Sequence, residues 1–398
     1  MRFIPVFITV FMIFATVSPY ISLLVRGLGY RPALVGVLLG VFEGAGIAGP
    51  FFFGYFADRT GRYRLCLIVT FVLSVIAVVP LVAFVHPLAS ALCLALLAFG
   101  FRSTIPLLDA FTTVSLKGSG DYGRIRTLGS FSFLVLTIFL QFTPVLRPNR
   151  PFNIALWIGF CSALAVFSAL PLPGKLINRN FCGTKWRKNL QVQQAPGMRP
   201  ALRPDSAGSK KRPLWSPPLV AGMIMIILIR LAMTPHYSFF PLYLVEYLQW
   251  DAVGLMFAMS SFSELPFMFL SGSLIRRFGP GKLLAVSAVG IGIRLSLYAF
   301  VPFRPVVLAA QALHALCFGL FHPAAVALIA DCVPPERRAL GMSLYLSLGT
   351  GFPAFLGNIL GGLVLEQWGY RVLFSSFVIF PLLAVVFFFI SPQGARKA

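Results

Sequence analysis

The sequence predicts an all-α membrane protein with twelve transmembrane helices in two pseudo-symmetric six-helix bundles. Its composition is the first reason: 58% of the residues are hydrophobic and only 11% are charged, whereas a soluble domain carries about 25% charged residues. The second reason is that apolar runs of about 20 residues, the length that crosses a bilayer, recur along the chain. A pair of matched loops, one in each half of the chain, is the third.

The expected spans follow one another with short connections, except after the sixth. The first is long and apolar, with no small-residue cleavage site before Arg26, so we expect an uncleaved helix rather than a signal peptide. The twelve ranges are 3–25, 33–56, 65–85, 88–114, 127–146, 152–171, 217–245, 252–275, 283–302, 305–330, 340–364 and 371–391.

The net charge of +22 indicates the orientation in the membrane rather than a nucleic-acid partner. In the expected topology, 24 of the 33 Lys and Arg residues fall in one set of alternating loops and termini. Only six fall in the other set, namely Arg26, Arg31, Arg147, Arg150, Arg304 and Arg371. Because cytoplasmic loops are enriched in Lys and Arg, we expect both termini on the cytoplasmic side of the membrane. We expect that membrane to be a bacterial inner (plasma) membrane.

One long hydrophilic stretch divides the chain. It is rich in Pro, Gly and basic residues and has no apolar periodicity, which is typical of a flexible linker. We expect an N-terminal six-helix bundle at 1–171, a basic cytoplasmic linker at 172–216, a C-terminal six-helix bundle at 217–391 and a cytoplasmic tail at 392–398.

The loops after the second and eighth spans share the pattern G-x-x-x-[D/R]-R-x-G, 218 residues apart. A glycine allows close helix approach, and a charged turn can change its ion pairs when two halves rock. An ordinary short loop could also carry Gly and Arg, but two matched copies favour an internal repeat. The residues are Gly54, Asp58, Arg59, Gly61 and Arg62 in the first copy, and Gly272, Arg276, Arg277 and Gly279 in the second.

The segment from Gly54 to Arg64, GYFADRTGRYR, resembles the signature loop between helices 2 and 3 of the major facilitator superfamily. The resemblance extends to the layout of six helices, a basic loop and six helices. It implies a transporter fold in which a solute site lies between two bundles.

Ionisable side chains inside the spans are few, and each costs about 2.5–3.5 kcal/mol at the bilayer centre, so each should be paired, hydrated or functional. We expect several to line a shared cavity near the midplane. The alternative is that they are structural pairs such as Glu43–Arg102 or Glu264–Arg294. The set comprises Glu43, Arg102, Asp109, Arg230, His236, Glu264, Arg294, His314 and His322, with Arg124 and Arg126 at the start of the fifth span.

Several of these residues stand in segments that resemble lactose permease and its relatives, the phenylpropionate and nucleoside permeases, a branch of proton symporters. The resemblance implies that Asp109, Arg126 and Glu264 bind substrate and that Glu264, Arg294 and His314 belong to a proton-coupling network. We also assign Glu43 and Arg102 to the predicted substrate-binding residues, because both lie inside membrane spans. The sequence also departs from the family, because Cys317 stands where the related permeases have a carboxylate. His322 precedes Pro323, and we interpret it as a group that satisfies backbone near the kink.

The predicted function is secondary active transport, with proton-coupled uptake of a small organic solute by alternating access. An aromatic or other organic acid, a sugar and a nucleoside all stay open as substrates. The alternatives are a proton-driven exporter of drugs or metabolites and a lipid flippase. Since no HExxH, GxSxG or P-loop occurs, we expect no enzyme activity. We expect a monomer with protons, a small-molecule substrate and the lipid bilayer as its partners, and no nucleic acid, metal or cofactor.

Overall fold

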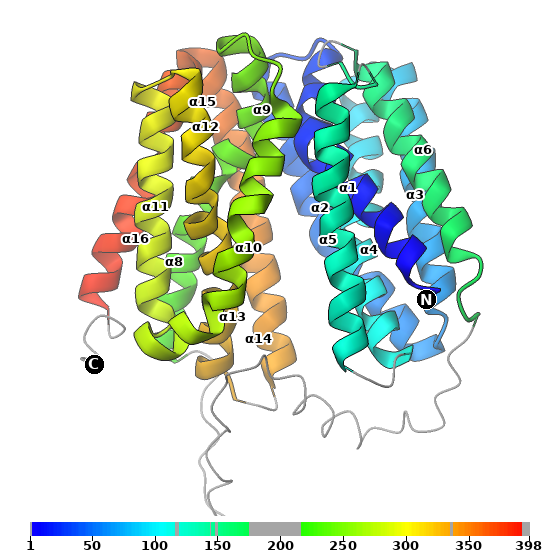
Figure 1. Ribbon diagram of the computed structural model, residues 1–398. Coiled ribbons are helices and arrows are strands. Elements are labelled where there is room, and N and C mark those ends of the chain that lie inside the picture. The colour runs from blue at the N-terminus through cyan, green and yellow to red at the C-terminus, as the bar shows by residue number, and fades with distance from the viewer. Residues whose placement is uncertain are drawn as a thin grey trace, which may run out of the picture. The chain divides into compact units, whose positions relative to one another are not determined.

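The computed structural model describes residues 2–115, 119–143, 145–147, 150–174, 216–334 and 337–391. Within these ranges the regular structure is helical throughout, as Figure 1 shows. The side chains of Arg124 and Arg126 lie outside the described part, as do most of the predicted linker and the tail at 392–398.

The helices of the first half are single, uninterrupted segments, whereas three spans of the second half contain π-helical turns. Such turns are rare and often mark functional sites. The first-half helices are α1 (Ile4–Gly27), α2 (Pro32–Thr60), α3 (Tyr63–Ala83), α4 (Pro87–Ser115), α5 (Ser119–Phe142) and α6 (Pro151–Ala169). The second half contains α8 (Pro217–Thr234), η1 (Pro235–Phe239), α9 (Phe240–Leu242), η2 (Tyr243–Tyr247), α10 (Val253–Phe278), α11 (Pro280–Phe300), α12 (Arg304–Ala309), η3 (Ala310–Leu313), η4 (Ala315–Leu320), α13 (Phe321–Cys332), α14 (Arg338–Leu344), η6 (Tyr345–Gly351), α15 (Phe352–Phe377) and α16 (Ile379–Ile390).

The predicted all-α membrane fold is confirmed. Ten helical stretches in the described ranges are long and apolar enough to cross a bilayer. The last of them, Leu340–Ile390, has a non-helical residue at Gly369, with φ of 76°, which divides it into two crossings. Helix α5 has 24 residues, and its described apolar part is the shorter Thr127–Phe142.

The chain forms two compact units whose boundaries interleave along the sequence. The first unit takes residues 1–177 together with 234–259 and 354–373, which belong to four spans of the second half. In it, α2 packs on α4, α3 packs on α4 and α6, and α1 packs on α5 and α6. Helix α1 is buried along most of its length, so it forms the core of this unit.

The second unit takes residues 178–233, 260–353 and 374–398. Helix α11 is its centre and packs on α13, α16 and the π-helical segment η4. Its buried side chains include Arg294, which is only 2% exposed. The predicted division into bundles at 1–171 and 217–391 remains a prediction.

Exposed apolar faces distinguish this fold from that of a water-soluble protein. On α3 the large exposed side chains recur every three or four residues, at Leu65, Val69, Val72, Ile76 and Val79. That spacing gathers them on one side of the helix. A contiguous apolar stripe of this length on the surface indicates contact with lipid rather than water.

Each of the two repeat loops contains a glycine with a positive φ angle. Gly61 closes α2 with φ of 68°, and Gly279 follows α10 with φ of 79°, a region of backbone space that favours glycine. In the first loop the Tyr63 hydroxyl donates to the Asp58 carboxylate. In the second, the Arg276 guanidinium donates to Ser273 Oγ at 3.0 Å.

Gly49 provides a test of the close packing between α2 and α4. A Cβ atom added at Gly49 would lie 2.1 Å from the Phe99 carbonyl oxygen and 2.6 Å from Ser103 Oγ. We therefore expect Gly49→Val to lower stability by about 1–3 kcal/mol, the usual cost of overpacking, measured as a lower midpoint of thermal unfolding in detergent micelles. The matched control is Gly159→Val, because a Cβ at Gly159 meets no atom within 4 Å. Equal effects of the two substitutions would contradict this packing.

Candidate functional site

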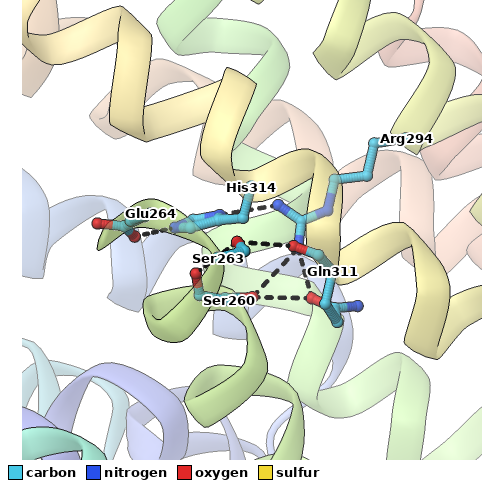
Figure 2. Close-up of polar contacts among 6 residues, drawn as sticks. All are labelled: Ser260, Ser263, Glu264, Arg294, Gln311 and His314. Atoms are coloured by element: carbon cyan, nitrogen blue, oxygen red, sulfur yellow. Dashed lines mark hydrogen bonds and ion pairs between the residues drawn. The ribbon is translucent and has the colours of Figure 1, made fainter. Parts of the chain in front are cut away.

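A connected group of polar side chains lies inside the second unit; we call it the Glu264 cluster. Three helices supply it: α10 carries Ser260 and Glu264, α11 carries Arg294 and Tyr298, and Gln311 and His314 lie at the start of the tenth span. Arg294 and Tyr298 are four residues apart and Gln311 and His314 are three apart, so each pair shares one helix face. Figure 2 shows the Arg294 guanidinium between Gln311 and His314, with Glu264 on the far side of His314.

The Arg294 guanidinium is surrounded by partners. Its Nε donates to Tyr298 Oη at 2.8 Å, and its Nη1 lies 2.8 Å from His314 Nδ1. Its Nη2 donates to the Gln311 side-chain oxygen and, at 3.4 Å, to Ser260 Oγ. A buried charge needs such partners because its desolvation is costly. Arg294 is therefore a fixed structural cation whose donors are directed at protein groups.

Gln311 holds this arrangement together. Besides accepting from Arg294, its side chain donates through the amide nitrogen to Tyr298 Oη at 3.0 Å and to the Val307 carbonyl oxygen at 2.8 Å. Ser260 Oγ donates to the same Gln311 side-chain oxygen at 2.9 Å. These bonds fix the guanidinium, and the guanidinium in turn orients the His314 ring.

The hydrogen bonds set the tautomer of His314. A guanidinium only donates, so the Nδ1 atom that faces Arg294 must be the acceptor. The ring proton is then on Nε2, which lies 2.6 Å from Glu264 Oε1. His314 thus connects Arg294 to Glu264 as a neutral imidazole that accepts at one nitrogen and donates at the other. Glu264 is the more accessible end, with 16% of its side chain exposed against 7% for His314.

The tenth span continues the line of rings beyond His314. Phe318 lies between His314 and His322, with ring centroids 6.0 and 5.9 Å away and nearly parallel planes. His322 Nδ1 is 2.8 Å from the hydroxyl of buried Tyr345. The partner of His322 is thus a tyrosine side chain of the eleventh span, in place of the backbone groups that the sequence suggested.

The first unit has its own charged pair. Arg102 of α4 forms a salt bridge with Glu43 of α2, and its guanidinium lies 5.5 Å from the Phe42 ring centroid and 5.9 Å from that of Phe101. Gly46 gives the arginine room, since a Cβ there would lie 2.7 Å from Arg102 Cγ. The structural pairing that the sequence left open is present here.

The structure describes the remaining predicted site residues in less detail. Asp109 lies two turns after Arg102 on α4 and is half-buried. Arg126 lies on α5, but its side chain is outside the described part. Glu264 and Arg294 do not pair directly, since His314 lies between them.

Sequence reasoning missed the neutral members of the Glu264 cluster, namely Ser260, Tyr298 and Gln311. A search for charged residues inside spans does not find them. Their spacing is a usable signal, however, because Tyr298 follows Arg294 by one helical turn and Gln311 precedes His314 by nearly one.

Comparison with known proteins places the chain among transporters. Residues 4–376 match the MFS_1 like family. The chain is 24% identical to the maltose permease of Geobacillus stearothermophilus over 371 residues, covering 93% of this chain and 81% of the permease. It is 22% identical to the probable 3-phenylpropionic acid transporter of Escherichia coli over 404 residues, covering 97% and 96%. The crystal structure of the nucleoside transporter NupG matches 100% of this chain and 99% of its own, with a TM-score of 0.75 and 15% identity, and so shares the fold.

A substitution of Gln311 tests whether the buried guanidinium depends on its neutral partners. Gln311→Leu removes an acceptor from Arg294 and a donor from Tyr298. We expect it to lower the free energy of unfolding by about 1–3 kcal/mol, the cost of leaving a buried polar group unsatisfied. Thermal unfolding in detergent micelles measures this. Gln367→Leu is the matched control, because Gln367 is exposed. An unchanged unfolding midpoint in the Gln311 variant would show that the guanidinium does not need this side chain.

Proposed function

The chain belongs to the MFS_1 like family of membrane transporters, and from this premise we propose that it is a secondary active transporter coupling proton entry to uptake of a small organic solute. It works by alternating access, in which one solute site opens to each side of the membrane in turn. The observation that carries the proton coupling is the chain of contacts from Arg294 through His314 to Glu264.

The geometry favours Glu264 as the group that takes up the proton. A second proton on His314 would have to go to Nδ1, and it would break the bond that this atom accepts from Arg294. A proton on the Glu264 carboxylate breaks none of these bonds, because His314 Nε2–H can still donate to the neutral carboxyl group. His314 is then a positioning residue.

Protonation of Glu264 would be coupled to solute binding through charge. The ionised carboxylate accepts a strong, charge-assisted bond from His314, and the neutral acid accepts a weaker one. If the solute-loaded and empty states stabilise the ionised Glu264 carboxylate to different extents, proton binding changes the relative populations of the two states. This is the differential interaction that a proton symporter needs.

The substrate and its surroundings are inferred from the relatives. Proteins similar to this chain include a maltose permease, a probable 3-phenylpropionic acid transporter and a nucleoside permease. We therefore propose a sugar, nucleoside or aromatic acid as substrate, with Glu43, Arg102, Asp109, Arg126 and Glu264 contributing to its binding. From the distribution of Lys and Arg we place both termini in the cytoplasm, and we propose a monomer in a bacterial inner membrane.

The first experiment identifies the solute and then tests coupling. A thermal-shift screen of sugars, nucleosides and aromatic acids across pH names the substrate. In proteoliposomes with an imposed proton gradient, we expect Glu264→Gln to reduce accumulation by about 5- to 150-fold, the range of an ordinary coupling free energy. Exchange of internal for external solute should persist in the variant, because exchange needs no net proton movement.

The comparison variant is Glu43→Gln, which also replaces a carboxylate by an amide. Because Glu43 is paired with Arg102 outside the Glu264 cluster, that variant is expected to keep the pH dependence of accumulation even if its affinity falls. Accumulation that still follows the proton gradient in Glu264→Gln would refute the assignment of the proton to Glu264.

A further inference from the structure

The tenth span carries a second histidine, His322, eight residues after His314, and the two rings differ in their surroundings. His314 is buried, whereas His322 is exposed. We propose that His322 is a proton-transfer residue, which accepts the proton from Glu264 and passes it to water on the cytoplasmic side. This proposal rests on the proton symport proposed above. It adds the release of the proton, a step for which the Glu264 cluster contains no group.

The hydrogen-bond partner of each histidine decides whether its ring can become cationic. His314 Nδ1 faces the Arg294 guanidinium, which only donates, so a second ring proton would break that bond. His322 Nδ1 instead lies 2.8 Å from the Tyr345 hydroxyl oxygen, which can accept as well as donate. When Nδ1–H donates to this oxygen, Nε2 has a lone pair, and a proton added there leaves the bond intact. His322 can therefore take up a proton where His314 cannot.

The Nε2 atom of His322 is open to exchange. Within the described ranges, no residue forms a hydrogen bond with it. An ionisable group inside a span usually faces the bundle interior or a water-filled space, and the exposure of this ring favours water. In the proposed orientation the tenth span runs from the outside to the cytoplasm, which places His322 about 10 Å nearer the cytoplasm than His314.

Glu264 lies close to this part of the tenth span. A Cβ atom added at Gly319, three residues before His322, would lie 3.5 Å from the Glu264 carbonyl oxygen and 3.6 Å from its Cα. Glu264 and His322 are also near enough for their charges to interact. Because a carboxylate favours a nearby cation, a proton that moves from Glu264 to His322 leaves two charges that stabilise each other.

Phe318 separates the two histidines and aligns their rings. Its ring is nearly parallel to both, with interplanar angles of 13° to His314 and 9° to His322. Residues four apart in an α-helix are offset by about 40° around the axis. The wider π-helical turn Ala315–Leu320 reduces that offset and so allows the stack. A phenyl ring carries no exchangeable proton, so the two histidines do not exchange protons directly and the transfer starts at Glu264.

The other charged groups of the neighbouring helices act on different partners. Arg230 of α8 interacts with Tyr345 through its charge. Helix α11 packs on α13 but directs its buried arginine, Arg294, at the other histidine of the tenth span. Among the described residues, Glu264 is the group whose charge acts on His322.

The proposed transfer moves one proton and no other atom. The O–H bond of the neutral Glu264 carboxyl group breaks, its oxygen keeps the electron pair, and an N–H bond forms at His322 Nε2, directly or through one water molecule. The imidazolium then releases a proton to cytoplasmic water and returns to the neutral ring. Glu264 ends each cycle ionised and accepts the charge-assisted bond from His314 again.

The first test titrates the four histidines of the full-length protein in lipid, with no solute added. Solid-state NMR of ring-¹⁵N-labelled histidine measures the charge of each ring, and His314→Asn and His322→Asn assign the two signals. We expect His322 to become an imidazolium on acidification while His314 keeps one protonated and one bare nitrogen. His86, exposed between α3 and α4, is the reference for a hydrated ring. A His322 ring that stays neutral while His86 becomes charged would overturn the proposal.

The same titration tests the influence of Glu264. At a pH where His322 is half charged in the unmodified protein, Glu264→Gln should lower its imidazolium fraction, because the neighbouring negative charge is gone. Glu43→Gln is the matched control and should leave that fraction unchanged, since Glu43 pairs with Arg102 in the other unit. Equal fractions in the unmodified protein and Glu264→Gln would refute the proposed pair.

The second test measures transport in proteoliposomes with the same pH on both sides, using labelled maltose, uridine and 3-phenylpropionate as probes. Net downhill efflux requires Glu264 to gain and lose a proton in every cycle, whereas exchange does not. We expect His322→Ala to slow net efflux by about 10²-fold, the low end of what a positioned proton-transfer side chain contributes, while exchange persists. Imidazole in the buffer should restore net efflux, and pyrazole, which has a similar shape but is a far weaker base, should not.

A His322→Ala variant that loses exchange as much as net efflux, or that pyrazole rescues as well as imidazole, would show a packing role and overturn the proposal. These results are separate from the fate of the symport itself. If the unmodified protein shows no accumulation driven by a proton gradient, the proposed function fails. If accumulation depends on Glu264 but His322 neither becomes charged nor affects net efflux, only the present proposal fails.

Discussion

The hydrogen bonding of one buried cation, Arg294, organises the candidate site. A guanidinium inside a membrane-spanning helix must be satisfied by protein groups because lipid offers none. Tyr298, Gln311, Ser260 and His314 meet this requirement. Since the guanidinium can only donate, it makes His314 an acceptor at Nδ1 and directs its single ring proton at Glu264. The hydrogen-bonding roles of the two His314 nitrogens thus follow from the need to bury Arg294.

Much of the fold could be predicted from the sequence, because the bilayer imposes a length and a composition on every crossing. The helix from Ile4 to Gly27 lies within two residues of the predicted first span, and α4 lies within one residue of the predicted fourth at each end. The break at Gly369 falls in the predicted gap between the last two spans. Glu264, Arg294 and His314 stood out for a related reason, since few ionisable groups are tolerated within apolar runs.

The pairing of these groups could not be predicted, because it depends on helix rotation and on side-chain conformations. Glu43 and Arg102 pair directly, whereas Glu264 and Arg294 are separated by His314. The neutral partner Gln311 carries no charge to attract notice. The contact between Arg26 and Glu246 joins residues 220 positions apart at the ends of spans, where charged residues are common and indicate topology. The π-helical turns beside His314 and Tyr345 shift the register of those helices, which a fixed period of 3.6 residues does not anticipate.

The central claim is that Glu264 gains and loses the proton while His314 stays a neutral positioning group. Infrared difference spectroscopy of the protein in lipid, titrated from alkaline to acidic pH, measures this directly through the C=O stretch of a protonated carboxyl group. We expect a band that grows on acidification, disappears in Glu264→Gln and persists in Glu43→Gln. A band that survives the Glu264 substitution, or imidazolium signals at His314 in its place, would contradict the claim.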